Sequence, residues 1–538
     1  MSRPQSIQID GRSLTPELVY QIAVQRHTVA LAPEVATKMA ASRRMVERYL
    51  DEERVVYGVT TGFGRFSDVV IPEDSRQTLQ LNLLRSHAAG VGIPFDPAIS
   101  RAMLLLRANA LVQGYSGIRP VVVETLLALL NKGVTPVIPS QGSVGASGDL
   151  APLAHLALVL VGEGEAWVGE RRMPGGQALA EVGVLPIHLE AKEGLALING
   201  TQAMTAMGSL GVYRAGFLAD LADVVGGMTT EVLRGIPGAF AEAVANVRPH
   251  PGHRESAANL RRMVEDSQLT TSPGELRVQD AYSIRCMPQV HGASRDGLAH
   301  IAAVIGRELN SVTDNPLLFE DLDRAISAGN FHGQPVALVL DYLAIVLAEW
   351  ANISERRIER MVNPSLSGLP AFLVAQGGLN SGLMIAQYTA ASLVSENKVW
   401  AHPSSVDSIP TSANQEDHVS MGTTAGRKAL LVLENLCTVL AIEMLCAAQA
   451  ADLLGPGLLS PRSRKLYEFV RETVPTWDQD RVLAEDIQNI LRRLESDSAF
   501  TLIHALLHGL SHAKVGDPAS DYVTLLSRAS TSRHLQLL

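Results

Sequence analysis

The pattern of apolar and polar positions along the chain is mostly helical. Four long segments are rich in Ala, Leu, Met or Glu with few internal Gly or Pro residues, a composition that favours helices. These segments are residues 121–131, 335–353, 382–398 and 427–454. The second is apolar in almost every direction around a helix, which predicts burial among several neighbours. Strand-like alternation is confined to short pieces such as residues 6–9 and 165–168, so we expect a mainly α fold.

Four loop segments interrupt these helices. Three are rich in Gly, Ser and Thr and the fourth is polar; they are residues 57–64, 140–149, 198–201 and 404–420. Catalytic and binding residues concentrate in loops that a rigid scaffold holds in place. We therefore expect the chemistry of this protein to lie in these segments.

Composition and charge narrow the class of protein. Of the 538 residues, 46% are hydrophobic, which excludes disorder as the main state. Three cysteines, an odd number, argue against a disulfide framework. A net charge of −10 without a Lys/Arg block argues against nucleic acid as a partner. No apolar signal region opens the chain, and no uninterrupted apolar stretch reaches the roughly 18 residues of a spanning helix. We expect a soluble cytoplasmic protein without membrane contact.

The familiar cofactor motifs do not account for the loops. No phosphate-binding G-x-x-x-x-G-K-[ST] sequence is present, and the glycines from Gly58 to Gly64 lack dinucleotide-binding spacing. The segment from Gly145 to Asp149 nearly matches a serine nucleophile elbow but carries Asp149 in place of the last glycine. No motif with convincing metal-ligand spacing occurs either. We therefore expect neither a metal ion nor a diffusible cofactor.

Small residues fill the segment before Asp149. Judged by residue type alone, this segment predicts a tight turn ahead of a buried helix that starts at Leu150, with Asp149 as its N-cap. The string GSVGASGDLAPLAH, however, resembles the signature of the histidine and aromatic amino acid ammonia-lyase family. In that family the Ala-Ser-Gly triplet, here Ala146, Ser147 and Gly148, cyclises and loses water to form 4-methylidene-imidazol-5-one (MIO). Glycine at the third position permits the sharp bend and the unobstructed amide that this cyclisation needs.

Further blocks carry the resemblance from about residue 57 to about residue 452. In chain order they are YGVTTGFG, NLLRSHAAGVG, GLALINGTQAM, VQDAYSIRCMPQV, ELNSVTDNPL, GNFHGQP, SENK and PTSANQEDHVSM. The chain is thus identified as a member of this family, and it is most similar to the histidine enzymes.

The resemblance also implies an architecture. It implies a long-helix bundle core of the fumarase/aspartase-like type with a loop-rich N-terminal region that carries the active site. We accordingly expect a loop-rich domain over residues 1–205, a long-helix domain over residues 206–455 and a C-terminal helical segment over residues 456–538. The family further implies a homotetramer in which each active site is assembled from several subunits.

Elimination of ammonia needs an electrophile for the amine and a base for the β-proton. The resemblance gives the first role to the MIO formed from Ala146, Ser147 and Gly148, and the second to Tyr57. A free tyrosine has a pKa near 10, so we expect nearby positive or hydrogen-bond-donating groups to lower the pKa of Tyr57.

Other site residues also follow from the resemblance. Arg285 matches the residue that clamps the substrate carboxylate, for which a guanidinium fork is suited. Asn199, Gln279 and Tyr282 match positions that hydrogen-bond the substrate or the MIO oxygen. Phe331 matches a residue that lies against the MIO.

Two residues favour histidine as the substrate. His87 and Glu416 match positions that face the imidazole in histidine ammonia-lyases, and a carboxylate favours a protonated or N–H-donating imidazole. Two residues depart from the usual histidine pattern: Gln334 stands in GNFHGQP, where Glu is usual, and Met287 precedes Pro-Gln. The reaction implied is conversion of L-histidine to trans-urocanate. A phenylalanine or tyrosine ammonia-lyase, an aromatic 2,3-aminomutase and a non-catalytic helical scaffold stay open as alternatives.

Overall fold

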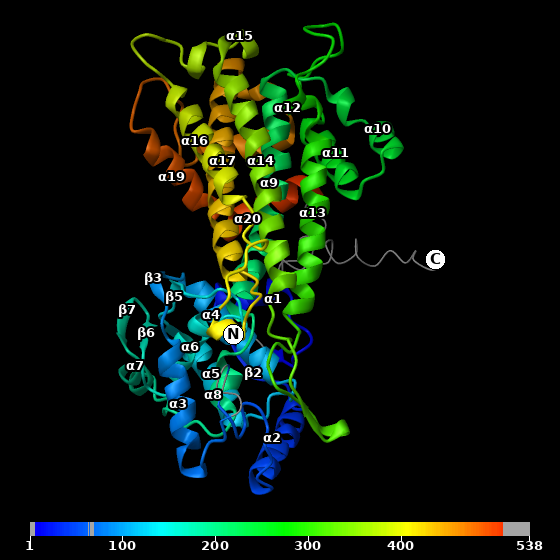
Figure 1. Cartoon of the computed structure of the whole chain (residues 1–538). Helices are drawn as coiled ribbons and strands as arrows, with labels where there is room; N and C mark the ends of the chain where they lie inside the picture. Colours follow the sequence, from blue (N-terminus) through cyan, green and yellow to red (C-terminus); the bar gives the residue numbers. More distant parts are fainter. Residues whose placement is uncertain (1–5, 63, 65–68, 509–538) are drawn as a thin grey trace. The chain divides into compact units, whose positions relative to one another are not determined.

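Helices make up most of the computed structural model, which describes residues 6–62, 64 and 69–508 (Figure 1). The prediction of a mainly α fold is confirmed. The chain divides into two compact units, each built from three separate segments. The first unit consists of Met1–Leu210, Ala302–Asp341 and Pro403–Arg427, and the second of Gly211–Ile301, Tyr342–His402 and Lys428–Leu538. The division into three consecutive domains stays a prediction, and residues 509–538 of its last segment lie outside the described residues.

The first unit combines short helices with short strands. Its helices are α1 (Pro16–Ala23), α2 (Val35–Asp51), α3 (Arg76–His87), α4 (Pro97–Leu111), α5 (Pro120–Lys132), α6 (Leu150–Leu160), α7 (Gly175–Glu181) and α8 (Glu193–Ile198). Its strands are β1 (Ile7–Ile9), β2 (Val29–Leu31), β3 (Val91–Pro94), β4 (Val134–Pro136), β5 (Pro139–Gln141), β6 (Glu165–Val168), β7 (Arg171–Pro174), β8 (Leu317–Phe319) and β9 (Arg324–Ile326). The two strand segments expected from the sequence are found as β1 and β6.

These strands form four small sheets rather than one large one. β1 pairs with β2 in parallel, with Ile7 opposite Val29. The other three sheets are antiparallel: β3 pairs with β5, β6 pairs with both β4 and β7, and β8 pairs with β9. Helices α3, α6 and α8 pack against one another, and α4 packs against α1 and α5. The first unit is therefore held together mainly by helix–helix packing, and its small sheets do not form the core.

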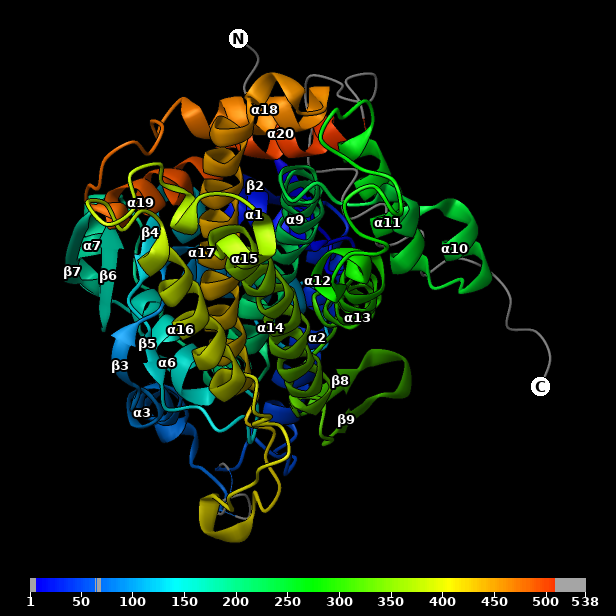
Figure 2. The same ribbon diagram turned by 90° about the horizontal axis from the view of Figure 1, so that it is seen from above.

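Long helices dominate the second unit. The four longest are α9 (Gln202–Val232), α13 (Met287–Glu308), α14 (Gln334–Val362) and α17 (Gly422–Leu454), and the unit boundary falls inside each of them. The shorter ones are α10 (Glu242–Val247), α11 (Pro251–Val264), α12 (Tyr282–Arg285), α15 (Pro364–Ser367), α16 (Met384–Trp400), α18 (Pro461–Arg471), α19 (Leu483–Leu494) and α20 (Asp497–His508). Figure 2 shows the long helices as neighbours when they are viewed near end-on.

All four helices expected from composition are present, as α5, α14, α16 and α17. Their ends follow local chemistry. In α5, Pro120 occupies the first turn, where its missing N–H costs nothing, and Gly133 ends the helix at φ +74°. By length and composition, α14 and α17 could cross a membrane, but 67% and 72% of their most apolar windows are buried inside the structure. Most of their apolar surface therefore lies in the helical core.

A buried polar network joins the long helices within the second unit. Arg357 of α14 donates to Glu443 of α17 from Nε at 2.6 Å and from Nη2 at 2.8 Å, and both side chains are fully buried. Thr229 of α9 donates to the same carboxylate at 2.8 Å. His291 of α13 lies 2.7 Å from Asp223 of α9. Because burial costs charged groups their hydration, each of these ions depends on its partner.

We expect the Arg357–Glu443 pair to matter for stability through the cost of breaking it. Arg357→Met leaves the Glu443 carboxylate buried without its cation, so the free energy of unfolding should fall by ~3–5 kcal/mol. Arg171→Ala is the matched control, because the Arg171–Glu181 ion pair is exposed and should contribute less than about 1 kcal/mol. Denaturant unfolding of the two variants measures the difference. Equal losses of unfolding free energy in the two variants would show that burial does not make the Arg357–Glu443 pair more important for stability.

Candidate active site

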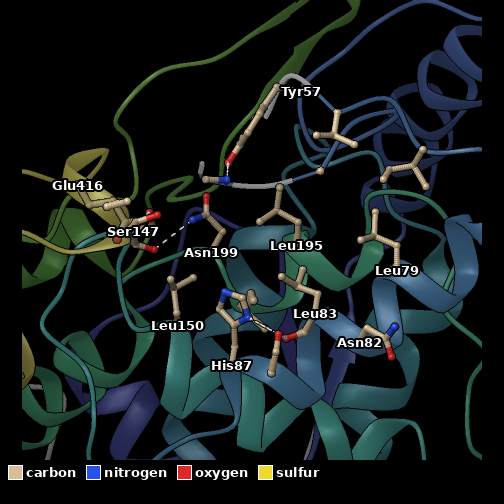
Figure 3. A pocket seen from close by; sticks show the side chains of 18 residues that line it. Tyr57, Leu79, Asn82, Leu83, His87, Ser147, Leu150, Leu195, Asn199 and Glu416 are labelled. Atoms are coloured by element: carbon tan, nitrogen blue, oxygen red, sulfur yellow. Dashed lines mark hydrogen bonds between the residues drawn. The ribbon is translucent and has the colours of Figure 1, made fainter. Parts of the chain in front are cut away.

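A cavity of about 810 Å³ lies in the first unit (Figure 3). Helices α3, α6 and α8 contribute to its wall, together with the loop that starts at Tyr57 and the turn that precedes Glu416. Its polar side chains include Tyr57, His87, Ser147, Asn199 and Glu416. Its apolar wall consists of Ile71, Leu79, Leu83, Leu150, Leu195 and Ile198. All four loops expected to carry chemistry thus contribute residues to one cavity.

Ser147 sits at the centre of a sharp backbone bend. Gly145 and Gly148 on either side have φ values of +66° and +75°, a region that side chains disfavour. A Cβ atom on Gly148 would lie 2.2 Å from the carbonyl oxygen of Gly200. Gly148 and Gly200 form a parallel bridge, and the Asp149 N–H donates to the Gly200 carbonyl oxygen at 2.7 Å. Glycine is therefore the residue that this approach admits.

Helix α6 begins at Leu150 with Asp149 at its N-cap position, as predicted, but the Asp149 side chain does not cap it. Its Oδ2 instead accepts the backbone N–H groups of Ala203 at 2.9 Å and Met204 at 3.0 Å, in the first turn of α9. Its Oδ1 accepts the hydroxyls of Ser143, at 3.1 Å, and Thr423. Burial raises the pKa of Asp149 even though these four donors oppose the shift. The carboxyl thus ties the bend to the start of a long helix.

Asn199 holds the other side of the bend. Its side-chain Nδ2 donates to the carbonyl oxygen of Ser147 at 3.1 Å. Its Oδ1 is buried and has no hydrogen-bond partner among the described residues. An unpaired buried acceptor is costly, so this amide oxygen is suited to accept a hydrogen bond from a bound molecule.

Glu416 reaches Ser147 from a strained turn. The Ser147 hydroxyl donates to Oε1 of Glu416 at 2.8 Å, and the Thr411 hydroxyl donates to Oε2 at 2.8 Å. Between Thr411 and Glu416, residues 412–414 have φ values of +52°, +52° and +65°, although none is glycine. Left-handed backbone at such residues costs free energy and persists only where the surroundings enforce it. Here the enforcing contacts include the Thr411–Glu416 backbone bridge.

Tyr57 enters the cavity from the loop opposite. The backbone N–H of Gly64 donates to its hydroxyl at 3.3 Å. Burial raises the pKa of Tyr57, the negative charge of Glu416 raises it further, and the Gly64 N–H only partly offsets them. The expected lowering is therefore not produced by the residues described in this cavity. None of the described lining residues is a lysine or arginine.

His87 ends α3 with its ring at the cavity. Its Nδ1 lies 2.9 Å from the carbonyl oxygen of Leu83, and a carbonyl can only accept, so Nδ1 carries the hydrogen. Burial lowers the pKa of His87, although Leu83 and Glu416 act in the other direction. The ring is then neutral at neutral pH, and its Nε2 presents a lone pair as an acceptor.

Comparison with known proteins places this cavity in a family. A family model for aromatic amino acid lyases matches residues 14–472. The chain belongs to the aromatic amino acid lyase family. A histidine ammonia-lyase of Symbiobacterium thermophilum is 57% identical to this lyase over 504 residues, which cover 93% of this chain and 99% of that protein.

Solved structures of this lyase family have the same fold. The crystal structure of a histidine ammonia-lyase from Trypanosoma cruzi matches with a TM-score of 0.89 and 43% identity, over 99% of both chains. A tyrosine aminomutase from Streptomyces globisporus matches with a TM-score of 0.88 and 39% identity, over 99% of this chain and 100% of that one. The long-helix bundle expected from the sequence is confirmed.

The lyase does not bring all predicted site residues to the cavity. Phe331 is in the same unit, half-buried and outside the lining. Gln279, Tyr282 and Arg285 belong to the second unit. Tyr282 is 72% exposed there, with the Arg285 guanidinium 4.9 Å from its ring centre. The roles predicted for these four residues stay predictions.

Sequence reasoning missed the residues that support this site. Gln334, noted above as a departure from the histidine pattern, does not line the cavity; its Nε2 donates to the Ser405 carbonyl at 2.9 Å. Asp341 accepts the N–H groups of Ser404 and Ser405, each at 2.7 Å. Both therefore hold the start of the segment that leads to Glu416. Their contacts join residues more than 60 positions apart, for which no local pattern gives a signal.

The tie between Asp149 and α9 generates a stability prediction. Asp149→Ala removes the acceptor for four buried donors, so the free energy of unfolding should fall by at least ~2 kcal/mol. Ser143→Ala is the matched control, because it removes only one of the four hydrogen bonds and should cost about 1 kcal/mol. Denaturant unfolding distinguishes them. An Asp149→Ala loss no larger than that of Ser143→Ala would contradict the role assigned to the carboxyl.

Proposed function

We propose that this protein is a histidine ammonia-lyase that converts L-histidine to trans-urocanate and ammonia. The observation that carries the proposal is the pair of acceptors in the cavity, the Glu416 carboxylate and the Nε2 atom of His87. A protonated imidazole ring can donate one N–H to each of these groups, whereas a phenyl ring offers no donor and would leave both unpaired, which is a strong basis for rejection. Relatives with the histidine ammonia-lyase name support the same substrate.

We also propose that Ala146, Ser147 and Gly148 form the MIO. Three observations fit it: the glycine-dependent bend, the Asn199 donor on the Ser147 carbonyl oxygen, and the unpaired Oδ1 of Asn199. Once formed, the group supplies the electrophile for the substrate amine. Its formation also removes the Ser147 hydroxyl, which frees Oε1 of Glu416 to accept a hydrogen from the substrate. That the reaction proceeds without a metal stays a prediction.

The chain's own residues then divide the remaining work. Tyr57, in its phenolate form, takes the β-proton on its oxygen as the C–N bond breaks and ammonia leaves. The apolar wall holds the flat ring and excludes water, while His87 and Glu416 orient it. Burial raises the pKa of Tyr57, so forming the phenolate needs a positive charge in addition to the described lining residues.

The proposed homotetramer answers this need. Arg285, in the second unit, is the proposed clamp for the substrate carboxylate, together with Gln279 and Tyr282. Assembly of each active site from several subunits, as in the related family, would bring such a cation to Tyr57. Phe331 would lie against the MIO. A cytoplasmic location stays part of the proposal.

A panel of amino acids tests the substrate. Purified protein is incubated separately with L-histidine, L-tyrosine and L-phenylalanine, and near-UV absorbance follows the unsaturated acid product. We expect urocanate to form fastest. Glu416→Gln and His87→Phe should each lower kcat/KM for histidine by about 10-fold or more. The first removes the negative charge that favours an N–H-donating imidazole, and the second removes an acceptor for the ring. Product from tyrosine or phenylalanine but not from histidine would refute the substrate assignment, and a β-amino acid product would indicate a 2,3-aminomutase.

Tyr57→Phe tests the base. Loss of a general base typically lowers the rate by about 10²–10⁴-fold, and we expect kcat to fall in this range. Binding of urocanate, measured by calorimetry, should change little because the ring of residue 57 is retained. A variant that keeps wild-type kcat would remove Tyr57 from the mechanism.

A further inference from the structure

A buried arginine lies behind the bend without an ionic partner. Arg107 of α4 is fully buried. Its Nη1 donates to the backbone carbonyl of Asn199 and to Oε1 of Gln202, each at 2.9 Å. Its Nε and Nη2 have no hydrogen-bond partner among the described residues. Burial lowers the pKa of Arg107 to about 10, which still leaves it charged at neutral pH.

The buried carboxylate of Asp314 does not form an ion pair with Arg107. Asp314 acts on Arg107 only through space. Its Oδ2 lies 2.7 Å from the ammonium of Lys192, and both of those side chains are fully buried. A buried cation without a bonded anion is expensive to keep. Fold stability alone gives no reason to retain it.

A second arginine on the same helix shows the contrast. Arg101 is also buried, but each nitrogen of its guanidinium has a carbonyl acceptor. Nε donates to Ala23 at 3.0 Å, Nη2 to Ile22 at 2.9 Å and Nη1 to Leu130 at 3.1 Å. These carbonyls lie in the last turns of α1 and α5, where a cation is favoured. Arg101 therefore has a complete structural role at two helix ends.

Arg107 instead packs behind the residues that hold the Ser147 bend. Asn199, whose carbonyl it binds, donates from Nδ2 to the Ser147 carbonyl oxygen at 3.1 Å. A Cβ atom on Gly200 would lie 2.4 Å from Nη1 of Arg107, so the guanidinium packs tightly against this corner. The Gly200 carbonyl in turn accepts the Asp149 N–H. The guanidinium thus binds the backbone of Asn199 and packs closely against Gly200.

We propose that Arg107 is a positioning residue for the elimination, acting through Asn199. It fixes the Asn199 backbone so that Nδ2 points at the Ser147 carbonyl oxygen. Its positive charge also favours negative charge on that oxygen, an effect that is strong in a site closed to water. This inference rests on the proposed lyase function and on the proposed MIO.

Four variants test the role: Arg107→Met, Arg107→Lys, and the same two changes at Arg101. The mass of the peptide spanning residues 143–150 gives the fraction of chains that have lost two waters, and kcat is expressed per modified chain. We expect Arg107→Met to lower the modified fraction and to lower kcat by about 10–100-fold, with KM for histidine within about threefold. Arg107→Lys keeps the charge and should recover at least about tenfold of that loss.

The Arg101 variants are the structural control. They should lower thermal stability but leave the modified fraction and kcat per modified chain within about twofold of wild type. Equal kcat losses at positions 101 and 107 would show that general destabilisation explains the effect, and would overturn the proposal. An Arg107→Met protein with wild-type modification and wild-type kcat would overturn it as well.

A double-mutant cycle tests whether Arg107 acts through Asn199. If it does, Arg107→Met should add less than about twofold to the loss caused by Asn199→Ala, because the group it positions is already gone. If the kcat losses of the two single variants multiply in the double variant, the proposal is overturned. A wild-type peptide that has lost no water would instead refute the MIO, and with it the basis of this inference, whereas the other contrary outcomes leave the proposed function intact.

Discussion

The close approach of Gly148 to Gly200 is the constraint on which the site depends. Two chain segments meet there at a distance that leaves no room for a Cβ atom. The contact forces the bend that presents Ser147, and it places Asn199 beside the Ser147 carbonyl. It also brings Asp149 to the start of α9, where its carboxyl accepts two backbone N–H groups. The start of α9 and the Ser147 bend are therefore joined at this point.

The electrostatics of the cavity follow from its burial. Desolvation keeps His87 neutral and Tyr57 protonated, while Glu416 contributes the negative charge of the lining. Such a lining is well suited to a ring that donates hydrogen bonds, but it does not activate a tyrosine base. Among the described lining residues no cation lowers the pKa of Tyr57, so the proposed function needs a positive charge from another segment of the chain or from another subunit.

The sequence predicted what local chemistry decides. Composition located α5, α14, α16 and α17 but not the long helices α9 and α13, and the small residues around Ser147 predicted the bend. Prediction from the sequence failed where the structure depends on contacts between distant residues. Asp149 has the sequence context of a cap for α6, yet tertiary packing gives its carboxyl to α9. Gln334 stood out as a departure in a motif near the site, but its amide holds the backbone of Ser405.

The support for Asn199 was equally hidden. Arg107 and Arg101 lie six positions apart in one apolar helix, and nothing in the sequence distinguishes an arginine that caps helix ends from one that lies behind the active site. Their guanidinium contacts separate the two roles. The family resemblance supplied the identity of the site residues, whereas the physical reasons for their placement came from the structure.

A crystal structure of the purified protein, examined at residues 146–148, tests the central claim most directly. The account predicts continuous density between the Gly148 nitrogen and the Ala146 carbonyl carbon, a planar ring, and no hydroxyl at residue 147. An open Ala-Ser-Gly chain whose serine hydroxyl still donates to Glu416, in protein that turns over histidine, would contradict it.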